Sequence, residues 1–384
     1  MSAPLSPGPG DRPEIRQLLA DHPVIDGHND LPWRIRTAYQ GDLDRLPFRE
    51  GDPGGHTDLP RLRTGGVGGQ FWSVYVSSLL PEPDAAVQTL DQLDLVRRLC
   101  ERYADRLAWA TTADEVAAAV DHGRIASLIG VEGGHSIASS LGVLRMLHAL
   151  GARYLTLTHN HATGWADSAT DTPRHGGLTD FGRDVVGELN RLGMIVDLSH
   201  VAYTTMRDAL AVTRAPVMFS HSSAYAVTDT PRNVPDDVLA ALPGNGGVCM
   251  VAFVSYFVSQ RVRDHQEEAG RAAQEDGVDT ADLDVMKPWW QAWKAEHPAP
   301  VSTVADVVAH VEHVRDVAGI AHVGLGGDFD GADDFPEGLA DVSGYPRLLT
   351  ALADRGWSRA DLAKLTGGNI LRVLRAVEDV AARG

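Results

Sequence analysis

The sequence contains very little cysteine. Only Cys100 and Cys249 are present in 384 residues, far apart and outside any Cys-x-x-Cys pair. This excludes a disulfide framework and a cysteine-based zinc site. Any metal ion that the protein holds must therefore be bound by histidine and carboxylate side chains.

Positive charge is also scarce. The chain has 34 basic and 52 acidic residues, for a net charge of −18, and it has no run of Lys or Arg that could neutralise a phosphate backbone. This argues against nucleic acid as a partner. No apolar stretch approaches the roughly 20 residues of a membrane span, and the N-terminus lacks the basic and apolar regions of an export signal. We therefore expect a cytoplasmic protein without a membrane partner.

Eight short apolar runs alternate with segments of helical periodicity. The predicted strands are Val24–Asp30, Gln70–Ser77, Ile125–Glu132, Tyr154–His159, Met194–His200, Val217–His221, Val248–Val254 and Val323–Asp328. The predicted helices are Asp84–Leu107, Gly142–Leu150, Phe181–Arg191, Tyr203–Ala211, Asp236–Leu242 and Thr303–Val317. Apolar strands that alternate with helices are typical of a parallel sheet covered by helices. The pattern and the length predict one domain over residues 1–384, an α/β fold of the (β/α)₈ TIM-barrel class.

Three segments interrupt this alternation. Residues 1–10 are rich in Pro, Gly and Ser and are predicted to be disordered. Arg34–Arg63 is rich in Gly, Pro and Asp and is predicted to be a loop insertion on the face that carries the site. Ser259–Pro300 is charged and is predicted to be a helical insertion that helps to shape the pocket. We expect its tryptophans to pack the insertion against its neighbour.

Several predicted strands end in a residue that can bind a metal ion. His28 and Asp30 close the first strand, and their spacing places both side chains on one face. Glu132 ends an apolar strand, where it could bridge two metal ions or pair with a buried arginine. His200 and His221 end two consecutive strands and place two imidazoles side by side. A set of imidazoles and carboxylates at the carboxyl ends of barrel strands predicts a two-metal site, which suits zinc and leaves manganese, iron and cobalt as alternatives.

Four more residues are candidates for substrate chemistry. His159 ends the fourth predicted strand and could polarise a substrate carbonyl, although it could also be a metal ligand. Asp328 ends the eighth strand and could transfer a proton, with Asp330 as the second candidate and a structural carboxylate as the alternative for either. Arg232 lies in a proline-bounded loop, where it could grip a substrate carboxylate or form an ordinary salt bridge.

In this order, these segments resemble the membrane (renal) dipeptidase family of binuclear zinc peptidases, which are amidohydrolase-like hydrolases. The resemblance extends over nearly the whole chain. It rests on Asp26–Pro32, Gly130–Gly134, Leu157–Asn160, Asp197–His200, Ser220–Ser222, Pro231–Asn233 and Gly326–Gly331. It implies two zinc ions per chain, one held by His28 and Asp30, the other by His200 and His221, with Glu132 bridging them.

The resemblance also implies substrate contacts. His159 would contact the scissile carbonyl, Arg232 would bind the C-terminal carboxylate, and Asp328 would handle the proton. Tyr256, which we place at the end of the seventh predicted strand, is a further candidate for substrate binding beside Arg232. The family's secretion, disulfide linkage and lipid anchor are not expected here, because the chain has too few cysteines and no matching signals.

The activity implied is a zinc-dependent dipeptidase that uses a metal-bridging hydroxide. Its substrates would be dipeptides with a free C-terminal carboxylate, including L-Xaa-D-Xaa dipeptides, and the family suggests a homodimer. Two alternatives stay open at this point. One is another binuclear amidohydrolase that acts on a non-peptide amide or ester, and the other is a metal-containing binding protein without turnover.

Overall fold

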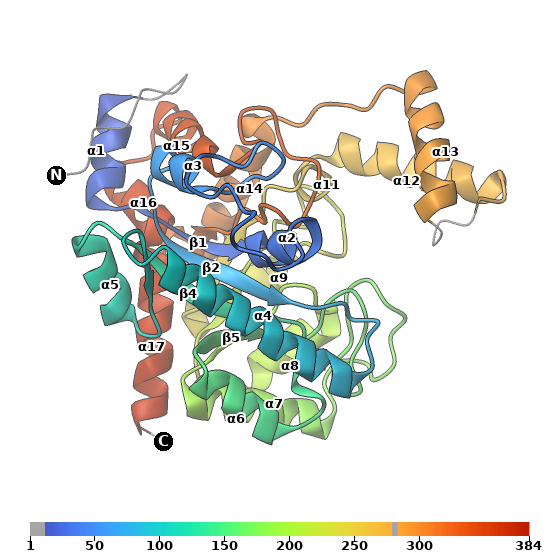
Figure 1. Ribbon diagram of the computed structural model, residues 1–384. Helices are drawn as coiled ribbons and strands as arrows, with labels where there is room; N and C mark the ends of the chain where they lie inside the picture. Colours follow the sequence, from blue (N-terminus) through green and yellow to red (C-terminus); the bar gives the residue numbers. More distant parts are fainter. Residues whose placement is uncertain (1–11, 279–282, 384) are drawn as a thin grey trace.

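Eight parallel strands form a nearly closed barrel with helices around it (Figure 1). The structure is a computed structural model that describes residues 12–278 and 283–383. The predicted disorder of residues 1–10 lies outside the described residues. The strands are β1 Val24–Asn29, β2 Val67–Tyr75, β3 Leu107–Trp109, β4 Ile125–Glu132, β5 Ala152–Thr156, β6 Ile195–Asp197, β7 Val217–Phe219, β8 Val248–Val251 and β9 Val323–Leu325. The predicted (β/α)₈ barrel is confirmed.

The strands follow one another around the barrel in the order β1-β2-β4-β5-β6-β7-β8-β9. Closure between the last and the first strand occurs at their carboxyl ends. There, the backbone N–H of Asp30 donates to the carbonyl of Phe329 at 2.9 Å, and the N–H of Asp328 donates to the carbonyl of His28 at 3.3 Å. The barrel is thus tied together at the end that carries the predicted site.

Helices lie between the strands, as the sequence predicts. They are α1 Pro13–Asp21, α2 Leu31–Ala38, α3 Leu59–Thr64, α4 Glu82–Arg102, α5 Ala113–Asp121, α6 Leu141–Ala149, α7 Asp180–Leu192, α8 Tyr203–Val212, α9 Asp236–Leu239, α10 Leu242–Asn245, α11 Ser255–Val258, α12 Gln260–Glu275, α13 Leu283–Glu296, α14 Val304–Ala318, α15 Tyr345–Asp354, α16 Arg359–Ala363 and α17 Asn369–Arg383. Short 3₁₀ turns are η1 Gly134–Ile137, η2 Ile320–His322 and η3 Val342–Gly344, and η4 Lys364–Gly368 is a π-helical turn. Side-chain caps mark several starts: Thr112, Ser140 and Thr179 each accept a backbone N–H of the first turn.

Two clusters of buried apolar side chains hold these layers together. The larger one lies between the strands and the surrounding helices and includes Trp72, Leu155 and Val251. The smaller one gathers side chains from successive strands, among them Ile25 and Met218, together with one face of α17. No helix among the described residues has the length and apolar character needed to cross a membrane.

Two predictions differ from the structure. The segment Arg34–Arg63 is not a loop throughout, because α2 and α3 lie at its two ends. A ninth strand, β3, was also not predicted. It is only three residues long and pairs with the first residues of β4. So short a run is below the length at which alternation of side chains can be recognised.

The predicted helical insertion is present as α12 and α13, which extend away from the barrel (Figure 1). Its tryptophans join the two helices: the Trp293 ring lies 4.8 Å from the ring of His265 on α12. The indole N–H of Trp289 donates to Asp276 at 2.8 Å. These contacts pack the two helices of the insertion against each other, whereas the prediction had the tryptophans pack the insertion against its neighbour.

Candidate functional site

The predicted site residues gather at the carboxyl end of the barrel. His28 lies in β1, and Glu132 is the last residue of β4. The others lie two or three residues beyond a strand end: His159 after β5, His200 after β6, His221 after β7 and Asp328 after β9. Because neighbouring strands run in parallel, residues at these positions meet around the barrel mouth. Strands β5, β6, β7 and β9 end two or three residues before their predicted ends, so most of these residues belong to the loops that leave them.

Glu132 lies at the centre of this group, and its two carboxylate oxygens face different imidazoles. Oε1 is 3.0 Å from Nε2 of His200 and 3.5 Å from Nε2 of His221. Oε2 is 3.4 Å from Nε2 of His28, and the same nitrogen is 3.1 Å from Oδ2 of Asp30. Each oxygen of Glu132 therefore has its own set of neighbouring donor atoms.

This donor set fits two divalent cations. Within the described part of the chain, three groups of possible ligand atoms lie within 4.8 Å of one another: His28, His221 and Asp328; Glu132, His159 and His200; and His28, Asp30 and Glu132. Imidazole and carboxylate ligands suit zinc and related first-row metal ions. A carboxylate whose oxygens face separate donor sets can bridge two such ions. His159 and Asp328 belong to these groups, so both lie close enough to the other ligand atoms to contact a metal ion as well.

Burial sets the protonation of these groups. Desolvation lowers the pKa of His159 to about 4 and lowers the pKa values of His200 and His221 well below the usual range. Burial alone would raise the pKa of Glu132, but the charge of His28 and a hydrogen bond from His200 hold it well below its usual range. Neutral imidazoles and ionised carboxylates are the forms that bind metal ions. The pKa shifts of His200, His221 and Glu132 thus favour the forms that bind a metal ion. The other two proposed ligands shift in the opposite direction: burial alone would lower the pKa of His28, but Tyr154, Glu132 and Asp30 raise it well above its usual range, and burial raises the pKa of Asp30.

His28 is held by a residue that the sequence analysis did not single out. Its Nδ1 lies 2.8 Å from the hydroxyl of Tyr154 on β5, which leaves Nε2 facing Glu132 and Asp30. A Cβ at Gly130 would lie only 1.8 Å from the Tyr154 ring, so glycine is required on the neighbouring strand. A buried tyrosine hydroxyl in an apolar strand needs a polar partner, which is the signal that could have identified Tyr154.

His221 is oriented in a comparable way. Its Nδ1 lies 2.8 Å from the hydroxyl of Ser220, and that hydroxyl donates to Oδ2 of Asp197 at 2.6 Å. Hydrogen bonds to the far nitrogen fix the ring and the tautomer of a metal-binding histidine. Asp197 is a carboxylate in an otherwise apolar strand, which is a signal that sequence reasoning could have used.

A β-bulge explains how β1 presents His28. Asp26 pairs with Gln70 and Asn29 pairs with Trp72, so β1 has one residue more than β2 between these points. A bulge of this kind turns side chains relative to the regular alternation. Asp26 consequently accepts hydrogen bonds from Gln70 and from Tyr345 of α15, while His28 faces Tyr154.

Asp328 and Asp330 have different surroundings, although both follow β9. Oδ1 of Asp328 is 3.9 Å from Nε2 of His28, and burial raises the pKa of Asp328 well above its usual range. A Cβ at Gly331 would lie 2.5 Å from this oxygen, so the backbone there closely approaches the carboxylate. Asp330 instead accepts the backbone N–H of His56 at 2.7 Å. Asp328 faces the metal-type cluster, by which we mean the possible ligands around Glu132. Asp330 forms a hydrogen bond to the loop after α2 that contains His56.

His159 is the more open of the imidazoles around Glu132. Its side chain is 13% exposed, compared with 7% for His200 and 1% for His221. Nε2 of His159 lies 3.7 Å from Oε1 of Glu132, and the ring lies 4.6 Å from the ring of Tyr75. Its Nδ1 has no hydrogen-bond partner among the described residues. Nδ1 is itself buried, so the ring is only partly open, and its Nε2 is the nitrogen that faces Glu132.

Arg232 is a buried cation next to this cluster. Its residue exposure is 5%, and Nη2 donates to the carbonyl of His221 at 3.4 Å. Nη1 is buried and has no hydrogen-bond partner within the described part of the chain. Burial lowers the pKa of Arg232 to about 10, so the guanidinium remains charged at neutral pH. A buried guanidinium with an unused donor is suited to bind an anionic group.

Tyr256 is placed differently from the prediction. β8 already ends at Val251, and Tyr256 lies in the short helix α11, where its hydroxyl donates to Glu267 at 3.4 Å. The side chain that contacts Arg232 is Phe257, whose ring centre lies 5.0 Å from the guanidinium carbon. The placement at a strand end is therefore wrong. The apolar run continues from the strand into the helix, so periodicity could not mark the boundary.

The remaining histidines of this region have structural partners, as expected for residues without a strand-end position. His135 approaches a backbone carbonyl at 3.0 Å, His161 approaches a serine hydroxyl at 2.7 Å, and His175 approaches a backbone carbonyl at 3.1 Å.

Comparison with known proteins supports the family resemblance that the sequence indicates. A family model described as membrane dipeptidase, peptidase family M19, matches residues 12–384. The chain is similar in structure to the probable dipeptidase PvdM from Pseudomonas aeruginosa, with a TM-score of 0.85 and 22% identity over 96% of this chain and 98% of that chain.

Two further solved structures share somewhat more sequence. The metallopeptidase dipeptidase AC, of family M19, has a TM-score of 0.76 and 28% identity over 93% of this chain and 99% of that chain. A metallopeptidase from Rhodobacter sphaeroides, solved with a phosphinate mimic of the dipeptide L-Ala-D-Ala, has a TM-score of 0.76 and 27% identity over 92% of this chain and 99% of that chain.

Proposed function

Because the chain belongs to the membrane dipeptidase family of metallopeptidases, we propose that it hydrolyses dipeptides that carry a free C-terminal carboxylate. The observation that carries this proposal is the buried Arg232, whose guanidinium has an unused donor beside the metal-type cluster. The charge of a substrate carboxylate would compensate the desolvation of this arginine. A clamp on the C-terminal carboxylate would place the last peptide bond of the substrate at the metal-type cluster.

We propose two zinc ions in this site. His28 and Asp30 would hold one ion, His200 and His221 the other, and Glu132 would contribute one oxygen to each. The observed division of the Glu132 oxygens between His28 on one side and His200 and His221 on the other supports this assignment. When bound, such ions polarise a carbonyl and lower the pKa of a water molecule toward about 7.

The side chains of the protein would orient the substrate and stabilise charge. Arg232 would bind the C-terminal carboxylate through a pair of N–H groups and so fix the position of the scissile bond. His159, which is neutral and partly open, would donate a hydrogen bond to the carbonyl oxygen as negative charge develops on it. Phe257 would keep the Arg232 guanidinium in place through their stacking contact.

Asp328 would move the proton. Because burial raises its pKa, this carboxyl group can hold a proton at a pH at which an exposed aspartate could not. It would take a proton from the attacking water and deliver it to the leaving amine. The position of Asp328 next to His28 supports this role.

We also propose that dipeptides with a D-residue at the C-terminal position are substrates. The support comes from the Rhodobacter sphaeroides relative, whose structure contains a mimic of L-Ala-D-Ala. A homodimeric state and a cytoplasmic location are further proposals, and sedimentation analysis and cell fractionation would test them.

The test of the proposed function compares free and C-terminally amidated dipeptides. Wild type should hydrolyse free L,L- and L,D-dipeptides and strongly disfavour their amides. Arg232→Lys should lose most of this preference, since an ammonium keeps the charge but cannot form the bidentate contact. The exposed Arg207→Lys on α8 is the matched control and should behave as wild type. If Arg232→Lys handled free and amidated dipeptides in the wild-type ratio, the carboxylate clamp would be incorrect.

A further inference from the structure

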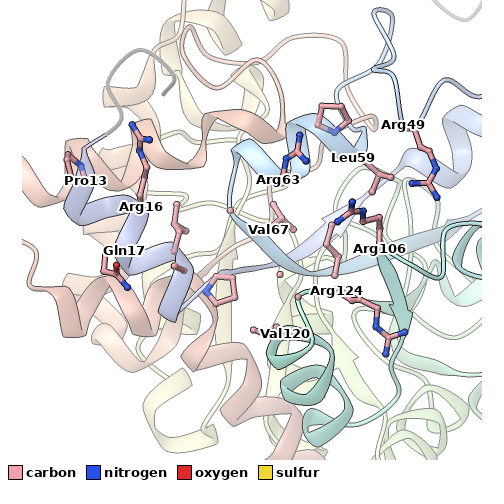
Figure 2. A pocket seen from close by; sticks show the side chains of 18 residues that line it. Pro13, Arg16, Gln17, Arg49, Leu59, Arg63, Val67, Arg106, Val120 and Arg124 are labelled. Atoms are coloured by element: carbon pink, nitrogen blue, oxygen red, sulfur yellow. The ribbon is translucent and has the colours of Figure 1, made fainter. Parts of the chain in front are cut away.

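A cavity lies at the amino ends of β1, β2 and β4, and the metal-type cluster lies at the carboxyl ends of the barrel strands. The volume of the cavity is about 940 Å³, and it is lined by Pro23, Val67 and Ile125 (Figure 2), which stand at the starts of β1, β2 and β4. The same three strands carry His28, Ser73 and Glu132 toward their other ends. The cavity is therefore separated from the proposed dipeptide site by the length of these strands, and nothing in the proposed function uses it.

The wall of this cavity is basic in a protein that is strongly acidic. Five arginines line it, namely Arg16, Arg49, Arg63, Arg106 and Arg124, and no acidic residue is among the described residues of the wall. The whole chain has more acidic than basic residues and a net charge of −18. Arg16 comes from α1, Arg63 from α3, and the others from loops before α3, β3 and β4, so the chain brings these side chains together from distant positions (Figure 2).

Nearby carboxylates neutralise only part of this charge. Asp105 serves two of the arginines: it lies 2.6 Å from Nη2 of Arg49 and 3.5 Å from Nε of Arg106. Arg124 donates to the backbone carbonyl of Ala104 at 3.5 Å. Neither Arg63 nor Arg124 forms an ion pair with a described residue. Several like charges gathered around one cavity repel one another, so an anion that enters would relieve this repulsion.

Apart from Gln17, the rest of the lining is apolar or glycine and includes Leu19, Leu59, Val67, Val120 and Ile125. An apolar floor with a few charged groups at its edge is typical of a site for a small organic molecule, and pockets of about 300–1,000 Å³ hold such ligands. Guanidinium groups match the geometry of phosphate and carboxylate oxygens. We propose that this cavity binds a small organic anion that carries two or more phosphate or carboxylate groups.

Calorimetric titration of the metal-loaded protein at low salt tests this proposal. The probes are fructose 1,6-bisphosphate for the phosphate class and citrate for the carboxylate class. At least one probe should bind saturably with one site per chain, and the affinity should fall as salt is added. The probe that binds tells the two ligand classes apart. Saturable binding by neither probe would overturn the proposal.

The double variant Arg63→Ala/Arg124→Ala tests the location of the site. It should weaken binding by on the order of tenfold or more, as expected for the loss of hydrogen bonds to a charged group. The matched control is Arg207→Ala/Arg383→Ala, which removes the same charge from exposed positions on α8 and α17 and should leave the affinity unchanged. Heat from extraction of metal by citrate would be common to all variants and would not count as binding.

Two outcomes of this comparison contradict the proposal. One is wild-type affinity in the pocket variant, and the other is an equal loss in the pocket and control variants, which would indicate a general charge effect. Thermal unfolding and metal content of the double variant establish that it is folded. If it were not folded, Arg63→Gln, which removes the charge and keeps a long polar side chain, would replace it and should weaken binding in the same direction.

Discussion

Asp328 and Asp330 lie two residues apart and are expected to differ sharply in function. Asp328→Asn should keep the fold and the metal content but lower kcat by about 10²–10⁴-fold, because an amide cannot transfer the proton while it preserves the shape. Asp330→Asn is the matched control, since its amide oxygen can still accept the N–H of His56, and its kcat should stay within about tenfold of wild type. Steady-state kinetics with metal analysis measures both. The reverse ranking would assign the proton transfer to Asp330.

A variant of His159 tells whether this residue contacts the substrate or binds a metal ion. His159→Ala should leave the zinc content unchanged and lower kcat by about 10²–10³-fold, which corresponds to ~2.7–4 kcal/mol of transition-state stabilisation. The reason is that the other five residues already give each ion three protein ligands when Glu132 is shared. His161→Ala, in the same loop and bonded to Ser78, serves as the control. Loss of about one zinc ion from His159→Ala would make His159 a ligand.

At the scale of single residues, the sequence predicted which residues meet at the barrel mouth but not the contacts that orient them. His200 and His221 could be recognised because a polar residue at the end of an apolar strand has no packing role. The sequence could indicate that the hydroxyl of Tyr154 needs a polar partner, but not that this partner is His28, because Tyr154 reaches His28 through the space left by Gly130 on the neighbouring strand. Such contacts depend on which strands are neighbours and on their register, which one sequence does not specify.

At the scale of elements, the predicted strands were located correctly, but their ends and irregularities were not. β6 ends at Asp197, so His200 lies in the following loop, with a left-handed backbone φ of 68°. The bulge in β1 and the short strand β3 were also missed. All of these features are set by pairing between strands. Side-chain periodicity within one strand carries no information about them.

The insertion after β8 contacts the loop that carries Arg232. Gln260 and Arg263, on the first turns of α12, both bind the carboxylate of Asp229, and the carbonyl of Phe257 accepts a hydrogen bond from Asn233 at 2.8 Å. These contacts join the start of the insertion to the residues around Arg232, while α13 lies away from the barrel. We infer that the start of the insertion positions Arg232.

Arg263→Ala tests this inference. It should raise KM for free dipeptides about two- to fivefold, the equivalent of a partly exposed ion pair worth ~0.5–1 kcal/mol, and change kcat less. Metal content should not change, because Arg263 contacts none of the proposed ligands. The neighbouring Arg261→Ala is the control, as its side chain is exposed on the same helix. A fall in kcat without a change in KM would contradict a role in positioning the carboxylate clamp.

At the scale of the whole molecule, the two ends of the barrel differ in chemistry. Imidazoles and carboxylates surround the carboxyl ends of the strands, and arginines surround the cavity at the amino ends. The hydrogen bonds between the segment after β9 and the end of β1 join the last part of the chain to the first, which supports our proposal of a single domain. The metal-type cluster at the carboxyl ends could be predicted from the sequence, because its residues come at the ends of the predicted strands. The cavity at the amino ends could not be predicted, because its arginines come from helices and loops that share no sequence pattern.

The central claim is that catalysis requires two metal ions held around Glu132. Removing metal with a strong chelator and adding zinc back in measured steps, with dipeptide hydrolysis followed at each step, tests it most directly. We predict about two zinc ions per chain in the active protein, loss of activity on chelation, and recovery only as occupancy of both positions is restored. Full activity with one zinc ion per chain, or with none, would contradict the account.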